Sequence, residues 1–129
     1  AYNDRAAARP IESYVYAQST CSPYNMRAGQ SRCPWLSGTA SWAYFTAAQY
    51  ILGIRPDYNG LLIDPCVPEW EGFSASRRFR GKMVNITVQN PNKVEKGVKS
   101  MTLNGEAING NVVPFDKMKD VNEVVVVMG

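Results

Sequence analysis

The sequence of 129 residues contains no histidine, and this absence excludes several kinds of catalytic site. A Ser-His-Asp triad or a Cys-His pair needs an imidazole as its base, so neither can form within the chain. The three cysteines, Cys21, Cys33 and Cys66, lack the spacing of a zinc or iron site, and without histidine such a site would have few ligands. We therefore expect no metal centre.

The chain also lacks nucleotide-binding loops, large basic patches and long apolar runs. There is no Walker loop and no dinucleotide-binding fingerprint. Its net charge of +3 comes from 14 basic and 11 acidic residues. The one tight basic cluster, Arg77, Arg78 and Arg80, is too small to indicate nucleic acid as a partner. No apolar run reaches the roughly 18–20 residues of a membrane-spanning helix, so we expect no membrane partner.

The amino terminus and the cysteines indicate the context of the chain. Residues 1–5 lack the charged-then-apolar order of a signal peptide. They also lack an initiator methionine, which fits a chain cut from a longer protein. A Cys21–Cys33 disulfide and free thiols are both open, and free thiols in a reducing cytoplasm fit an odd number of cysteines better. We therefore expect a cytoplasmic protein.

The first half of the sequence has helical periodicity. Residues 10–18 repeat apolar side chains at helical spacing, after a proline that a first turn tolerates. Residues 19–34 are polar, contain glycine and proline, and indicate a loop. A second helix is predicted from about residue 37 or 39 to residue 52, because Gly53 is placed to end it.

The second predicted helix is apolar on nearly every side. Its large or apolar residues are Trp42, Ala43, Tyr44, Phe45, Ala47, Ala48, Tyr50, Ile51 and Leu52. A helix of this kind is normally buried among other helices. Since the chain supplies only one other predicted helix, the remaining partners must come from elsewhere.

The second half of the sequence changes to short strands. Gly81, Asn104-Gly105 and Asn109-Gly110 mark turns between alternating or apolar segments. The predicted strands are residues 74–80, 83–88, 98–103, 111–113 and 123–127. Val124–Val127 is a continuous apolar run, which predicts a strand covered on both faces. Together these segments predict an antiparallel β-sandwich, and residues 55–72 would connect it to the helical half.

Two short segments are candidates for chemistry. Glu69 and Glu71 flank Trp70 and could form a carboxylate pair beside a sugar-stacking ring. Residues two apart lie too close together to straddle a glycosidic bond, so a tryptophan anchor with two solvated acids is the favoured interpretation.

The other candidate is the predicted start of the second helix. Ser37 and Thr39 offer hydroxyl donors, Gly38 permits close backbone approach, and a helix N-terminus attracts anions, so this segment could bind phosphate. Composition by itself favours the simpler alternative, in which a serine or threonine caps the helix.

A collinear set of motifs then extends through nearly the whole chain: Tyr14–Gln18, Trp35–Trp42, Tyr50–Pro56, Gly60–Pro68, Glu69–Phe73, Phe79–Gly81, Gln89–Asn92, Lys96–Val98 and Val127–Gly129. In this order they resemble glycoside hydrolase family ninety-four, the cellobiose and chitobiose phosphorylase family. The resemblance implies an α+β fragment. Residues 1–56 would be the C-terminal end of an (α/α)6 catalytic barrel, and residues 57–129 a C-terminal antiparallel β-sandwich of jelly-roll type.

The same resemblance implies an activity. Members of the family are inverting phosphorylases that cleave a β-linked disaccharide, such as cellobiose, with inorganic phosphate. Phosphate attacks the anomeric carbon while an aspartic acid protonates the leaving oxygen, giving an α-sugar 1-phosphate and a monosaccharide. No metal or organic cofactor is needed. The partners implied are the disaccharide, phosphate, the rest of the barrel and a second copy of the intact enzyme in a homodimer.

Carried over residue by residue, the family's phosphate-binding Thr-Gly pair falls on Ser37-Gly38, where serine keeps the hydroxyl. The family's glutamine on the glycone side falls on Gln18. The general acid and the phosphate-binding arginine and histidine lie upstream in the family, so the resemblance implies no catalytic residue here and an inactive isolated chain. Residues 21–33 depart from the cellobiose phosphorylase pattern and border the acceptor sugar, so the disaccharide stays open. The alternative function is a non-catalytic carbohydrate-binding or dimerisation β-module.

Overall fold

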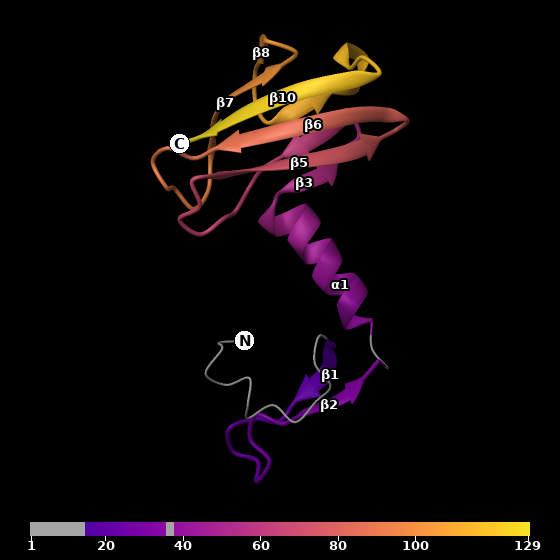
Figure 1. The fold of residues 1–129 in the computed structure, drawn as a ribbon, viewed down its shortest axis with the longest axis vertical. Coiled ribbons are helices and arrows are strands. Elements are labelled where there is room, and N and C mark those ends of the chain that lie inside the picture. The colour runs from indigo at the N-terminus through magenta and orange to yellow at the C-terminus, as the bar shows by residue number, and fades with distance from the viewer. Residues whose placement is uncertain (1–14, 36–37) are drawn as a thin grey trace. The chain divides into compact units, whose positions relative to one another are not determined.

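The computed structural model describes residues 15–35 and 38–129. The chain divides into two compact units, with the boundary between Phe45 and Thr46 (Figure 1). In the first unit, strands β1 (Ala17–Thr20) and β2 (Ser31–Pro34) pair as an antiparallel hairpin. The second unit contains one hydrophobic core.

The hairpin β1–β2 corrects two predictions. Gln18 was expected at the end of a helix and residues 19–34 in a loop, but Thr20 pairs with Ser31 across the hairpin. The hydroxyl groups of these two residues also form a hydrogen bond of 3.2 Å. Cross-strand pairing satisfies the backbone groups that an open loop would leave to water, whereas the helical pattern covers barely one turn among the described residues. Residues 10–14 of the predicted helix lie outside the described residues.

The second predicted helix is confirmed over residues 39–51. The α-helix α1 (Thr39–Thr46) continues into a π-helical turn, η2 (Ala47–Ile51). Gly53 ends the helix as predicted, in the left-handed region at φ +68°. A Cβ atom at this position would lie 2.0 Å from the carbonyl oxygen of Asp64, so no other residue fits without a shift of the backbone.

None of the residues of α1 and η2 is buried by the rest of the chain. Trp42 is 68% exposed and Tyr44 is 78% exposed, and Phe45, Tyr50 and Ile51 are exposed as well. A helix with apolar side chains on all sides cannot cover itself. This exposure agrees with the expectation that covering partners lie outside the chain.

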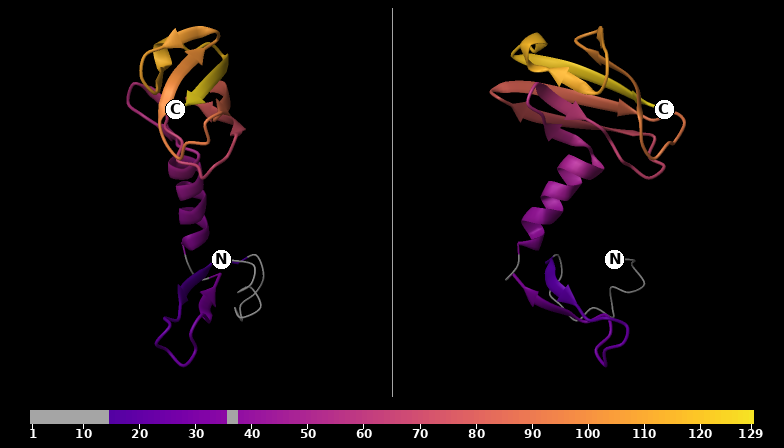
Figure 2. Two further views of the ribbon diagram at one scale, coloured as in Figure 1. Left: turned by 90° about the vertical axis from the view of Figure 1, so that its left-hand side faces the viewer. Right: turned by 180° about the vertical axis from the view of Figure 1, so that it is seen from behind.

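The second unit contains two sheets. The five-stranded sheet has the order β5-β6-β10-β7-β8, and the three-stranded sheet the order β3-β4-β9. Both sheets contribute to one hydrophobic core, which includes Leu61, Val113, Ile86 and Val126. Figure 2 shows the strands of this unit from two further directions. The strands are β3 (Ile54–Pro56), β4 (Gly60–Ile63), β5 (Gly72–Phe79), β6 (Lys82–Gln89), β7 (Val98–Leu103), β8 (Glu106–Ile108), β9 (Val112–Pro114) and β10 (Val121–Met128), and the short helix η3 (Phe115–Lys117) precedes β10.

Local hairpins of this unit are confirmed. Arg80 and Gly81 both have positive φ, 47° and 85°, in the turn between β5 and β6. Asn104 and Gly105 have φ of 52° and 88° between β7 and β8. Two successive residues with positive φ form a two-residue turn. The twist of such a turn matches the twist of the two strands that it joins.

Three predictions for the second half of the sequence are wrong. They concern the antiparallel sheet, the connection over residues 55–72 and the burial of one strand on both faces. The sheet is not wholly antiparallel, because β10 pairs parallel to β6, with Val121 opposite Met83. Residues 90–120 provide the long crossover that parallel strands require, and no local motif indicates it. Residues 55–72 are not a plain connection, since they contain β3 and β4, whose turn is closed by the Asp57 amide donating to the Gly60 carbonyl at 2.9 Å.

The run Val124–Val127 is likewise not covered on both faces. Val124 is 1% exposed and Val126 is fully buried, but Val125 is 36% exposed. Val125 lies opposite Thr87 and Thr102 on the outer face of the sheet, whereas its neighbours face the core. The strand therefore alternates in burial although its sequence does not alternate in polarity.

Cys21, Cys33 and Cys66 are free thiols in this structure. Across residues 15–35 and 38–129 no helix is long and apolar enough to span a bilayer.

Asn122 is a buried polar residue that joins three segments of the second unit. Its side-chain amide donates to the carbonyls of Met83 at 3.1 Å and Lys119 at 2.8 Å. Its carbonyl oxygen accepts from the amide of Lys119 at 2.8 Å and from the side chain of Asn104 at 3.3 Å. Such a side chain is costly to remove, because its partners would stay buried without hydrogen bonds.

We expect Asn122→Ala to lower the free energy of unfolding by at least about 2 kcal/mol, since an unsatisfied buried group costs roughly 1–3 kcal/mol. The measurement is urea unfolding of the 129-residue chain followed by circular dichroism. Asn92→Ala, at an exposed turn position, is the control and should stay within about 0.5 kcal/mol of the original chain. Equal stability of both variants would contradict the role given to Asn122.

The exposed helix leads to a second prediction. We expect the isolated chain to self-associate, because an apolar surface of this size promotes contacts between molecules. Replacing Trp42 and Tyr44 together by serine should reduce the mean mass measured by light scattering, whereas replacing the exposed Tyr58 by serine should not. A monodisperse monomer of the original chain at micromolar concentration would overturn this expectation.

Candidate functional site

The candidate site begins at the first turn of α1. The Trp42 amide donates to the Gly38 carbonyl at 3.0 Å, which makes Gly38 the residue at which helical hydrogen bonding starts. The first turn contains no acidic residue. The backbone amides of a first turn point away from the helix and carry partial positive charge, so this end of α1 favours an anion.

Gly38 is exposed and leaves room beside the helix start. A Cβ atom there would meet the ring of Trp42 at 3.5 Å, an ordinary contact. The fold therefore accepts a small side chain at position 38, and an effect of such a substitution on a ligand would not come from a damaged helix. Ser37, the other predicted phosphate-binding residue, lies outside the described residues.

Gln18, the predicted sugar-binding residue, is exposed on β1. The hydroxyl of Thr39 donates to the carbonyl of Ala17 at 3.3 Å. Because Ala17 precedes Gln18 and Thr39 follows Gly38, this hydrogen bond holds the two predicted site residues in adjacent parts of the first unit. The sequence pattern predicts that the Thr39 hydroxyl donates a hydrogen bond to phosphate. In the structure this hydroxyl donates to the backbone of β1 instead. A bond between residues this far apart in the chain has no local sequence signal.

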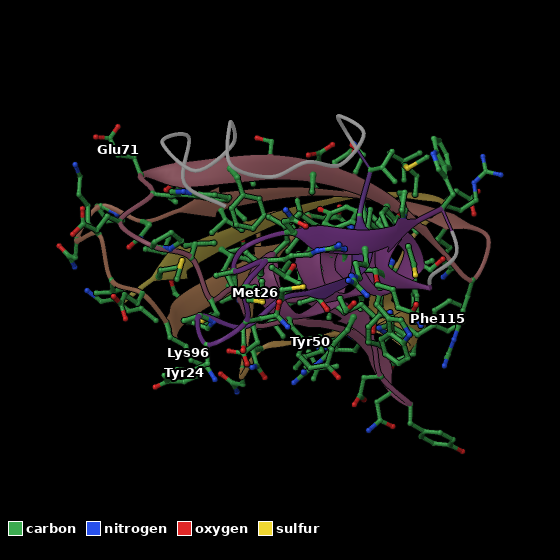
Figure 3. All side chains as sticks on the ribbon, turned by 90° about the horizontal axis from the view of Figure 1, so that it is seen from below. Tyr24, Met26, Tyr50, Glu71, Lys96 and Phe115 are labelled. Carbon is green, nitrogen blue, oxygen red and sulfur yellow. The ribbon has the colours of Figure 1, made fainter. Side chains whose placement is uncertain are left out.

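A second feature of the first unit was not predicted. The loop between β1 and β2 is closed by its own backbone, with the Cys21 amide donating to the Gln30 carbonyl at 2.8 Å and the Gly29 amide to the Cys21 carbonyl at 3.0 Å. At its tip Tyr24 is 98% exposed, and Met26 is fully exposed (Figure 3). An ordered loop that presents an aromatic ring to solvent is a suitable surface for a sugar, because rings stack on the C–H faces of sugars.

The segment around Trp70 matches the anchoring interpretation. The ring of Trp70 packs edge-to-face on Phe73, with ring centroids 6.3 Å apart. The carboxylate of Glu71 forms an exposed ion pair of 3.3 Å with Lys93 and points to solvent (Figure 3). Neither feature resembles a catalytic carboxylate pair. The described residues also contain no group of histidine, cysteine or carboxylate side chains that could hold a metal ion.

Comparison of the sequence with known proteins indicates a family. Residues 1–53, which include Gln18, Ser37 and Gly38, match the family "Glycosyl hydrolase 94 superfamily, catalytic domain". The chain is 44% identical over 128 residues to the N,N'-diacetylchitobiose phosphorylase of Vibrio proteolyticus and 40% identical over 129 residues to that of Vibrio furnissii. Each alignment covers 98% of the chain and 16% of the relative.

A third relative has a different named substrate. The chain is 38% identical over 105 residues to the solabiose phosphorylase of Paenibacillus borealis, an alignment that covers 81% of the chain and 14% of the relative. The chain thus spans about a sixth of the length of these curated relatives. Similarity to disaccharide phosphorylases continues beyond the catalytic-domain match into the β-rich unit. The chain belongs to the glycosyl hydrolase 94 superfamily.

Proposed function

We propose that the chain is the C-terminal part of an inverting β-glycoside phosphorylase, which cleaves a β-linked disaccharide with inorganic phosphate. The phosphorylase relatives support this reaction, and the match of residues 1–53 to a catalytic domain supports a role in the site itself. In the proposed reaction the bond from the anomeric carbon to the leaving oxygen breaks, and a bond to a phosphate oxygen forms. The leaving oxygen takes its proton from an acid outside this chain.

The proposed roles are divided between two adjacent elements. Ser37 and Gly38 bind phosphate at the start of α1, and Gln18 binds the sugar that is transferred. The observation that carries this assignment is the hydrogen bond from Thr39 to Ala17, which keeps the two elements together. Direct displacement needs phosphate and sugar to be held side by side, since the gain from bringing two reactants together depends on their geometry.

The helix start would stabilise the charge of the phosphate as well as fix its position. A phosphate dianion near the first turn interacts with the partial positive charge of the backbone amides, and no carboxylate of that turn opposes it. Gly38 lets the anion approach the backbone closely because it has no side chain. These contacts are most valuable when water is excluded, as they would be inside a complete catalytic domain.

The exposed helix supports the proposal that residues 1–56 are the end of an (α/α)6 barrel. Trp42, Tyr44 and Ile51 are exposed on α1 and η2, which is the expected state of a barrel helix without its neighbours. The general acid and the remaining phosphate ligands would come from those neighbours. The β-rich unit would then be the C-terminal domain beside the barrel, although its jelly-roll topology stays a prediction.

The loop that carries Tyr24 extends the proposal to the second sugar. It continues directly from β1, which carries Gln18, and residues 21–33, which contain this loop, depart from the cellobiose phosphorylase pattern. We therefore place the acceptor sugar near this loop. The loop would select the class of disaccharide, and the helix start and β1 would bind the groups that react.

Substitutions at the helix start test the proposed function in the intact enzyme. Ser37→Ala should raise the phosphate KM or lower kcat/KM for phosphate about tenfold to a hundredfold, because a charge-assisted hydrogen bond contributes roughly 1.5–3 kcal/mol. Gly38→Val should have a larger effect, since its side chain would stand where phosphate approaches the backbone. Thr46→Ala, an exposed position at the other end of α1, is the matched control and should leave phosphate kinetics unchanged.

The capping alternative makes the opposite prediction for the same variants. Ser37→Ala would then lower the free energy of unfolding by about 1 kcal/mol and leave the phosphate kinetics intact. Melting temperatures and phosphate KM values measured on one set of variants separate the two. Unchanged kinetics for both Ser37→Ala and Gly38→Val would refute a phosphate site at the start of α1.

A further inference from the structure

A cavity of about 360 Å³ lies in the second unit, between the β7–β8 hairpin and the segment from the end of η3 to Lys119. Leu103, Ala107 and Ile108 provide its apolar wall. Cavities that hold small molecules have volumes of about 300–1,000 Å³. This one is at the small end of that range, so it suits a ligand the size of a single sugar ring.

The rim of the cavity has an excess of positive charge. Lys117 and Lys119 line it from one side and Glu106 from the other. Within residues 15–35 and 38–129, ion pairs join Lys93 to Glu71 and Lys96 to Asp64, and neither rim lysine takes part in one. The two ammonium groups outnumber the one carboxylate of the rim, so the rim attracts an anion. Binding an anion would not require either lysine to break an ion pair with the protein.

The side of the cavity formed by the hairpin is fixed by hydrogen bonds to β10. The Asn104 amide donates to the Glu123 carbonyl at 2.7 Å, and the Glu123 amide donates to the Asn104 side chain at 2.9 Å. Asn122, fully buried, accepts from the Asn104 side chain and exchanges two hydrogen bonds with the backbone of Lys119. One buried side chain therefore links both sides of the cavity.

Hydrogen bonds from Lys82 also hold the lysine side of the cavity in place. Lys82 donates to the carbonyls of Phe115 and Met118, and its ammonium group lies 4.5 Å from the centroid of the Phe115 ring. These contacts fix the backbone on both sides of Lys117. A cavity whose sides are already in place costs little conformational entropy on binding, which favours affinity for a small ligand.

We propose that this cavity binds a monosaccharide that carries a phosphate or carboxylate group. The anionic group would bind Lys117 and Lys119, the C–H face of the ring would pack on the apolar wall, and ring hydroxyl groups would donate to Glu106. The site is separate from the start of α1 and does not depend on the proposed phosphorolysis. It would give the β-rich unit a binding function of its own.

Isothermal titration calorimetry on the 129-residue chain tests the site, with glucose 6-phosphate and glucuronate as the two anionic probes. Glucose and inorganic phosphate, titrated separately, supply the sugar ring and the anion alone. The variants are Lys117→Gln and Lys119→Gln, which remove a charge without touching the hydrogen bonds of the walls. Lys99→Gln, an exposed lysine of β7 outside the cavity lining, is the matched control, and circular dichroism checks that all chains fold.

We expect saturable binding of glucose 6-phosphate, glucuronate or both, at Kd values below those of glucose and of inorganic phosphate. Each cavity variant should raise the Kd about fivefold or more, since it removes one charged contact, and Lys99→Gln should not. A response to one probe alone identifies the anionic group that the site takes. The proposal is overturned if neither probe binds, if inorganic phosphate binds as tightly as the sugars, or if both cavity variants bind like the original chain.

Discussion

The hydroxyl of Thr39 donates to the carbonyl of Ala17 and ties the hairpin β1–β2 to the first turn of α1. The arrangement of the first unit depends on this contact, because the hairpin is short and most of its residues are exposed. Through it, Gln18 and Gly38, the two described residues of the proposed site, each neighbour a residue of this hydrogen bond.

The elements that sequence predicts correctly are those fixed by neighbouring residues. Gly53 ends the helix and Asn104-Gly105 turns the chain between β7 and β8, since each needs a backbone conformation that few residues adopt. Most of the failures involve contacts between residues that are distant in the sequence. The parallel pairing of β10 with β6, the exposure of Val125 and the strand that carries Gln18 are each set by a partner strand elsewhere in the chain.

The candidate site follows the same division. The start of α1 is visible in the sequence, because glycine between hydroxyl residues ahead of an apolar helix is a local pattern. The tie to β1, the exposed ring of Tyr24 and the cavity beside Lys117 are not visible, because each depends on how the chain folds back on itself. The roles proposed for Gln18, Ser37 and Gly38 come from the family resemblance, and physical chemistry gives the reason why such residues would suit those roles.

In the proposed function, this chain contributes part of a phosphorolytic site and does not form the site by itself. The most direct test compares the intact protein with the 129-residue chain, each incubated with chitobiose or cellobiose, with and without inorganic phosphate. The account predicts release of sugar 1-phosphate by the intact protein only when phosphate is present, and no release by the isolated chain under either condition. Turnover by the isolated chain, or cleavage by the intact protein that does not need phosphate, would contradict it.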